Sequence, residues 1–205
     1  MTSPRETTHR LAPAFEDPVM EAQAAFRQLL AAQAQPGSIA ILRGPVPPPP
    51  LGIAAGAVAL TLLDHDTRLW LGDRLLAAGV DDYLRFHCGC PLVRDPSQAD
   101  FGFASDPSDL PPLDRFMQGD DLFPHRSTTV VVEVSRLASP GTLRLVGPGI
   151  ETETSLEIGP MSEDFWATRR AMQADFPLGV DLIFTSGDSL AAFPRSTSLA
   201  GNPCM

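Results

Sequence analysis

The chain has 205 residues, of which 43% are hydrophobic and 20% charged, so it can bury a substantial core and is not intrinsically disordered. Its formal net charge is -10, and an acidic surface of this kind repels phosphate backbones and anionic lipids, which argues against nucleic-acid and membrane partners. All 15 basic residues are arginines. A chain without lysine cannot form the Schiff base that pyridoxal phosphate needs, and it has no Walker-type phosphate loop.

Helices and strands alternate along the first half of the chain. Asp17 and Pro18 are typical of a helix start, and the apolar spacing that follows predicts a helix that ends at Pro36 and Gly37. A long apolar run predicts a buried helix over 52–63, because a membrane span takes roughly 20 residues. The other elements expected here are strands over 38–43, 68–71 and 99–104 and helices over 74–87 and 109–118.

Strands dominate the second half. The β-branched run over 128–134 is typical of a central strand, and we expect 142–146 to pair with it as a hairpin across the turn residues 139–141. A helix follows over 163–174, and 180–185 pairs with 190–193 as a last strand pair. This order predicts one α/β domain, with a mixed β-sheet flanked by helices.

The N-terminal segment is charged and has no apolar stretch, so it does not resemble a secretion signal. We expect a flexible N-terminal arm over 1–14 and a single domain over 15–205. The odd number of cysteines lacks the spacing of a disulfide framework and gives no support for export. The sequence therefore predicts a cytoplasmic protein.

His87, Cys88 and Cys90 form the most reactive-looking segment. Both residue types are zinc ligands, but zinc sites usually space their cysteines by two to four residues and add a second ligand pair. The remaining cysteine, Cys204, stands alone. We therefore expect buried or free thiols, with neither a metal site nor a cysteine nucleophile.

Three arginines occupy unusual places. Arg144 lies in an apolar strand, Arg195 follows Pro194 at the end of the last strand, and Arg85 lies near a helix end. In an acidic protein such arginines either pair with carboxylates or bind an anionic ligand with two parallel hydrogen bonds. We expect a structural ion pair for Arg144. Arg195 is expected to contact a ligand or partner, because loops at strand ends often carry function.

Five segments resemble the PhnH family of the bacterial carbon–phosphorus lyase system, in the family's order. The last is the most specific, with its FPLG-x-D and PR-x-T elements. The segments are PVMEAQAAFRQLLAAQAQPG (18–37), LTLLDHDTRLWL (60–71), LRFHCGCPLV (84–93), GTLRLVGPGI (141–150) and FPLGVDLIFTSGDSLAAFPRST (176–197).

The resemblance implies a fold similar to that of pyridoxal-phosphate-dependent transferases, in a family that does not use that cofactor. It implies assembly with PhnG, PhnI and PhnJ, and a homodimer when the subunit is isolated. With PhnG, PhnI and PhnL, the family member attaches a phosphonate to ribose C1 of MgATP. Adenine is displaced and a ribose 1-phosphonate 5-triphosphate forms; PhnJ, a radical-SAM iron–sulfur protein, later breaks the C–P bond.

The resemblance identifies no catalytic residue, and it leaves ligand- or partner-binding candidates. These are Arg85, His87, Arg144, Asp181, Arg195 and Thr197. Three functions stay open: an accessory subunit of the phosphonate-activating complex, a stand-alone enzyme that binds a nucleotide or phosphonate through an arginine-lined anion site, and an acidic homodimer without a ligand. The first is favoured because no nucleophile–base pair or metal set stands out in the sequence.

Overall fold

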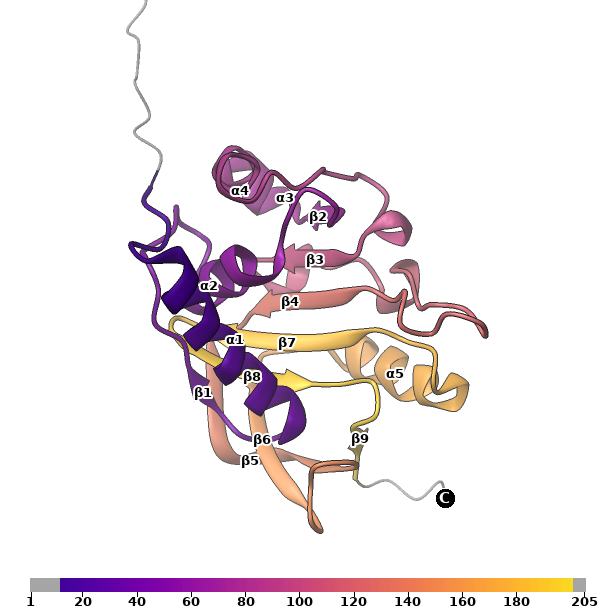
Figure 1. Ribbon diagram of the computed structural model, residues 1–205. Coiled ribbons are helices and arrows are strands. Elements are labelled where there is room, and N and C mark those ends of the chain that lie inside the picture. The colour runs from indigo at the N-terminus through magenta and orange to yellow at the C-terminus, as the bar shows by residue number, and fades with distance from the viewer. Residues whose placement is uncertain (1–11, 201–205) are drawn as a thin grey trace, which may run out of the picture.

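The structure is a computed structural model that describes residues 12–200. A six-stranded sheet of order β1-β8-β7-β4-β3-β2 forms its centre (Figure 1). Strands β2, β3, β4 and β7 are parallel, and β8 and β1 add antiparallel pairs, so the expected mixed α/β sheet is confirmed. The strands are β1 (Ala40–Ile41), β2 (Leu69–Leu71), β3 (Phe101–Ala104), β4 (Thr129–Glu133), β7 (Asp181–Ser186) and β8 (Ser189–Phe193).

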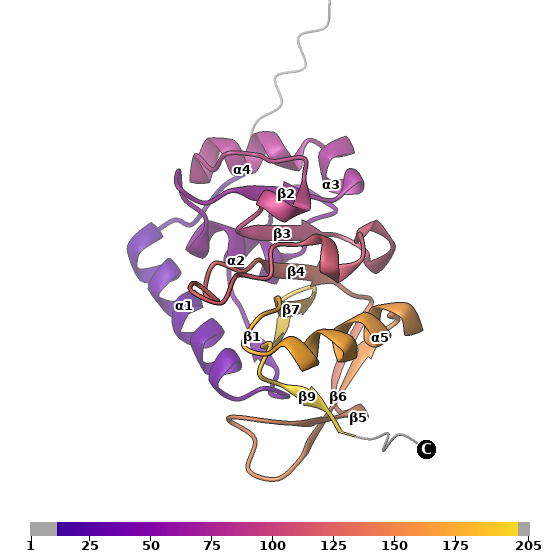
Figure 2. The same cartoon turned by 90° about the vertical axis from the view of Figure 1, so that its right-hand side faces the viewer.

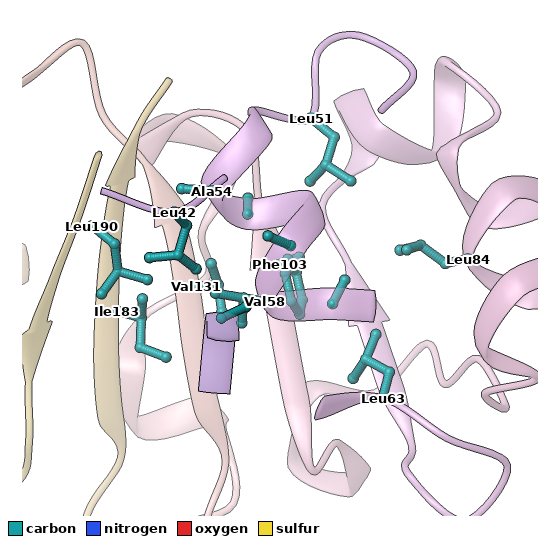
Figure 3. Packing of buried hydrophobic residues seen from close by; sticks show 14 of the residues in the cluster. Leu42, Leu51, Ala54, Val58, Leu63, Leu84, Phe103, Val131, Ile183 and Leu190 are labelled. Carbon is teal, nitrogen blue, oxygen red and sulfur yellow. The ribbon is translucent and has the colours of Figure 1, made fainter. Parts of the chain in front are cut away.

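Two hydrophobic clusters cover the two faces of this sheet. Strand β4 alternates between them, with Val131 in one cluster and Val130 and Val132 in the other, because successive side chains of a strand point to opposite faces. The helices are α1 (Pro18–Ala34), α2 (Ile53–Leu62), α3 (Asp73–Ala77), α4 (Val80–Cys88) and α5 (Glu163–Ala171). Helices α1, α2 and α4 pack over the Val131 face, where Figure 3 shows Ala54 and Val58 of α2 near Val131. Helix α5 packs over the opposite face (Figure 2).

Local signals explain where the first two helices form. The Asp17 side chain accepts a hydrogen bond from Met20 N at 3.1 Å and caps α1. Helix α2 is buried along most of its length, with residues 54–59 nearly inaccessible to solvent, as its uniformly apolar sequence predicts. Within residues 12–200, no helix combines the length and the apolar character that a membrane crossing requires.

The helix expected over 74–87 is two helices. Gly79 separates α3 from α4 and adopts a left-handed conformation with φ of +73°, which a helix does not continue through. The helix expected over 109–118 is also absent. That stretch contains only a short 3₁₀ turn at Leu113–Arg115, preceded by another at Pro107–Asp109, because Pro111 and Pro112 cannot donate to a helical ladder.

The hairpin expected between 128–134 and 142–146 is wrong. Strand β4 pairs with β3 and β7 on its two sides, so it has no free edge for a third strand. Strand β5 (Arg136–Val146) instead pairs with β6 (Thr154–Gly159) and β9 (Ser198–Leu199) in a second sheet. The expected turn at 139–141 lies inside β5, where the register shifts between Ala138 and Leu143.

Candidate functional site

A cleft of about 880 Å³ opens at the carboxyl edge of the parallel strands. Ser105, which follows β3, lies beside Glu133 at the end of β4 and Ser186 at the end of β7, and all three line the cleft. The strand register brings these positions together, because Ala104 pairs with Val132 and Glu133 pairs with Thr185. In open α/β sheets, ligands bind outside the carboxyl ends of the strands, so this cleft is the leading candidate site.

Two connections complete the walls of the cleft. One is the segment after β3, and the other is the segment from β6 into α5, where Ser162 Oγ accepts a hydrogen bond from Phe165 N at 3.1 Å and caps the helix. The lining contains both hydroxyl groups and apolar side chains. The remaining lining residues are Asp106, Pro107, Ser108, Leu110, Val134, Ser135, Pro160 and Met161.

Glu133 is held firmly at the base of this edge. Its Oε1 accepts from Gly187 N at 2.7 Å, and its Oε2 accepts from the Thr185 hydroxyl at 2.5 Å. A Cβ atom at Gly52, the N-cap of α2, would lie 2.5 Å from Glu133 Oε2. Glycine at this position therefore lets the carboxylate approach the positive end of the α2 dipole.

Ser105 is the least satisfied polar group of the cleft wall. Its Oγ is buried and has no hydrogen-bond partner in the described part of the chain. A buried hydroxyl left without a partner costs about 1–3 kcal/mol. The Ser105 hydroxyl therefore adds no hydrogen bond to the stability of the described fold.

Of the residues predicted from sequence, Asp181, Arg195 and Thr197 gather at the opposite, amino edge of β7. The Asp181 carboxylate accepts from Arg195 Nη2 at 2.9 Å, from Nε at 3.3 Å and from the Arg195 backbone N at 2.7 Å. Arg195 Nη1 donates to the carbonyl oxygens of Pro124 at 2.6 Å and Pro177 at 3.4 Å. This guanidinium is therefore engaged on both branches by the protein itself, which weighs against the expected ligand contact.

Arg169 on α5 belongs to the same region, and sequence reasoning missed it. Its side chain is 3% exposed, and Nη2 donates to the carbonyl oxygens of Pro194 and Thr197, both at 3.0 Å. Burial lowers the pKa of Arg169 to about 10, and the nearby Asp181 carboxylate opposes this shift, so the guanidinium stays charged at neutral pH. The sequence does contain a signal for its burial: Arg169 follows Trp166 by three positions and therefore lies on the same, buried face of the helix.

Thr197 is fully buried at the turn that Arg169 holds. Its carbonyl oxygen also accepts from Gln173 Nε2 at 3.1 Å, while its Oγ1 has no partner among residues 12–200. The Arg169 and Gln173 side chains together fix the segment that leads from β8 into β9. This arrangement gives Thr197 a place in the structural core of the fold.

The other three candidates lie apart from this group. Arg144 on β5 forms an ion pair with Glu153, with Nη2 and Nε at 2.6 and 2.7 Å from Oε1, and its side chain is 64% exposed. Arg85 and His87 lie on α4 beside β2, at the other end of the large sheet (Figure 1). Arg85 is exposed, and His87 Nε2 lies 3.0 Å from the carbonyl oxygen of Ala12. The structure brings the six candidates to no common cleft.

Comparisons with known proteins identify the family. The family model described as "PhnH: Bacterial phosphonate metabolism protein (PhnH)" matches residues 13–200. The chain belongs to the PhnH family. It is 40% identical over 190 residues, which cover 91% of this chain and 94% of the relative, to the alpha-D-ribose 1-methylphosphonate 5-triphosphate synthase subunit PhnH of Rhizobium meliloti. It is also 34% identical over 179 residues (86% of this chain, 85% of the relative) to a protein of Stutzerimonas stutzeri named as the C-P lyase subunit HtxG.

Two cysteines of this PhnH-family chain, Cys88 and Cys90, lie within the described residues and are free thiols. Cys88 Sγ lies 3.7 Å from the carbonyl oxygen of Ala59, and Cys90 Sγ lies 3.9 Å from that of Leu84. Burial raises the pKa of the Cys88 thiol to about 12, with a smaller contribution from Cys90, so it carries almost no thiolate at neutral pH. Cys204 lies outside the described residues.

Proposed function

We propose that this chain is the PhnH subunit of a complex that converts MgATP and an alkylphosphonate to adenine and a ribose 1-alkylphosphonate 5-triphosphate. The observation that carries the proposal is the 40% identity to a subunit named for that synthase, over 94% of its length. The second relative, named as a C-P lyase subunit, supports the same role. Organic phosphonate catabolism is thus the process that the chain serves.

The role proposed for this subunit is accessory: it acts with PhnG, PhnI, PhnJ and PhnL in the bacterial cytoplasm and forms a homodimer when isolated. An apolar stripe on the outer face of α1 supports partner binding. Its members Val19, Phe26 and Leu30 are 77%, 47% and 57% exposed. Large apolar side chains grouped on one exposed helix face are typical of protein interaction surfaces.

We also infer a relation between this fold and the pyridoxal-phosphate-dependent transferases, which the mixed sheet with helices on its faces supports. The residues present do not fit the cofactor. The chain contains no lysine, so no side chain can form the aldimine that anchors pyridoxal phosphate. The single domain proposed over 15–205 is consistent with two hydrophobic clusters that share one central sheet.

The alternative, a stand-alone enzyme with an arginine-lined anion site, has less support. Arg144 and Arg195 pair with Glu153 and Asp181, and Arg85 lies on α4 at the other end of the sheet. An anion site requires arginines whose donors converge on one point. Their separation favours the accessory role.

Deletion and complementation test the proposal. A strain that lacks this gene is expected to grow on inorganic phosphate and to fail on methylphosphonate as the only phosphorus source, and the wild-type gene restores growth. Tagged protein from the complemented strain is expected to co-purify with PhnG, PhnI and PhnJ. Normal growth of the deletion strain on methylphosphonate would refute the proposal, and so would complementation by a chain that binds none of these subunits.

A further inference from the structure

Exposed apolar side chains gather on two loops at the amino edge of the large sheet. One loop, 119–126, precedes β4 and projects beyond the strands at the right of Figure 1, and the other, 174–177, precedes β7. Leu122 and Phe123 on the first loop are 81% and 39% exposed, and Phe176 on the second is 59% exposed. We call these three side chains the amino-edge patch.

Arg195 holds the two loops together. Its Nη1 donates to the carbonyl oxygen of Pro124 at 2.6 Å and to that of Pro177 at 3.4 Å. Pro124 directly follows Phe123, and Pro177 directly follows Phe176, so the segments that carry the patch meet at one guanidinium nitrogen. The FPLG-x-D and PR-x-T elements of the sequence thus contribute to the same contact.

The first loop has a fixed shape. Asp120 Oδ1 accepts hydrogen bonds from the backbone N–H groups of Leu122 at 2.9 Å and Phe123 at 2.8 Å. Gly119 has a φ of +80°, and a Cβ atom there would lie 2.7 Å from the Pro124 carbonyl oxygen, so the turn closes only with glycine. A loop fixed in this way keeps Leu122 exposed and loses little conformational freedom when a partner covers it.

The charge around the patch sets the kind of partner. Asp120, Asp121 and Asp175 are exposed on these loops, and Arg126, whose guanidinium lies 4.2 Å from the centre of the Phe123 ring, is their one arginine. Two copies of this chain that met through the patch would bring like charges together, and an anionic lipid surface would be repelled as well. A different protein with basic residues around an apolar pocket would complement both the charge and the apolar centre.

We infer that the amino-edge patch docks into an apolar pocket, rimmed by arginine or lysine, on another subunit of the complex, with Leu122 as the central contact. This inference rests on the proposed function, which supplies the partner subunits, and it deepens that function by assigning a surface to the contact between unlike chains. The patch is distinct from the apolar stripe of α1, because it lies on the loops before β4 and β7.

A binding titration tests this inference with the full chain and a complex of PhnG, PhnI and PhnJ purified from a strain that lacks it. The wild-type chain is expected to bind saturably, and more weakly as salt screens the charges around the patch. Leu122→Ser and Phe176→Ser are each expected to bind at least about tenfold more weakly. Phe86→Ser, which changes an exposed phenylalanine of α4 outside both loops, is the matched control and should bind like the wild type.

A charge reversal tests the basic rim. Asp121→Arg is expected to weaken binding by about threefold or more at low salt, chiefly through slower association. Glu151→Arg makes the same change at an exposed position outside the patch and should leave the affinity unchanged. Binding of the wild-type chain that strengthens with salt would overturn the inference.

The remaining outcomes separate this inference from the proposed function. Wild-type binding that Leu122→Ser retains in full would overturn the inference alone, and Phe176→Ser keeps the test valid if Leu122→Ser fails to fold. Reduced self-association of Leu122→Ser in light scattering would assign the patch to a second copy and would also overturn it. No binding by the wild-type chain would overturn the proposed function together with the inference.

Discussion

At the residue scale, Arg195 and Arg144 both pair with a carboxylate, but their surroundings differ. Arg195 and Asp181 are 19% and 20% exposed, and two further carbonyl groups accept from the same guanidinium. Arg144 is 64% exposed, so solvent competes with Glu153 for its donors. Burial determines how much an ion pair contributes to the free energy of unfolding. When one partner is removed, the other charge is left without compensation only if water cannot solvate it.

Replacement of these two arginines is therefore expected to have unequal effects. Arg195→Ala should lower the free energy of unfolding by about 2–4 kcal/mol, because Asp181 and two carbonyls lose their partner. Arg144→Ala, the matched control, should lower it by less than about 1 kcal/mol. Urea denaturation of the purified variants measures both. If Arg195→Ala is as stable as the wild-type protein, the result would instead support the ligand contact expected from sequence.

At the element scale, one ion pair joins the starts of two parallel strands. Arg68, just before β2, donates from its backbone N and from Nε to Asp100 Oδ2 at 2.8 and 2.9 Å, and its Nη2 lies 2.8 Å from Oδ1. The Asp100 N–H in turn donates to the Arg68 carbonyl oxygen at 2.8 Å. The hydrogen bonds from the Arg68 guanidinium and backbone hold the pKa of Asp100 below its ordinary value of 3.8.

This lowered pKa predicts a pH dependence of stability. Because the folded state holds the Asp100 proton less tightly than the unfolded state does, the stabilisation is complete above pH 3.8 and is lost as pH falls further. Asp100→Asn should lower the free energy of unfolding by about 1 kcal/mol near neutral pH, since solvent partly screens the pair. It should also reduce the dependence of the free energy of unfolding on pH in the acid range. Urea denaturation between about pH 2.5 and about pH 7 checks this. An equal reduction in the exposed control Asp121→Asn would contradict it.

At the scale of the whole molecule, α1 covers one side of the sheet (Figure 1). Its exposed apolar residues form a stripe on the outer face of the helix. The helix buries Ala25, Leu29 and Ala32 against the core, so its inner face accounts for its place in the fold. The outer residues Phe26 and Leu30 contribute no comparable burial within the chain. A surface of this kind is stabilised when a partner covers it.

Substitution on this stripe is expected to separate folding from assembly. Phe26→Asp should change the free energy of unfolding by less than about 0.5 kcal/mol, as surface substitutions usually do, and should reduce both self-association and co-purification with the partner subunits. Gln28→Asp places the same charge on another exposed face of α1 and should leave assembly unchanged. Light scattering and pull-down measure the outcome. Equal assembly of the two variants would exclude the stripe as an interface.

The sequence by itself determined the features that depend on near neighbours. The Asp17 cap and the apolar spacing after it located α1, and the β-branched run around Val131 located a central strand. Strands β7 and β8 pair across a short turn as expected, because their contacts are local along the chain. The resemblance to the PhnH family also came from sequence alone, and the comparisons confirm it.

Tertiary structure decided the features that depend on distant segments. Strand β5 pairs with β6 and β9 because β3 and β7, from either side of it in the sequence, already occupy both edges of β4. The partner of Arg195 and the burial of Arg169 follow from packing between α5, β7 and the turn before β9. The carboxyl-edge cleft is likewise lined by the ends of three strands that are far apart in the sequence, and the register of the parallel sheet brings them together.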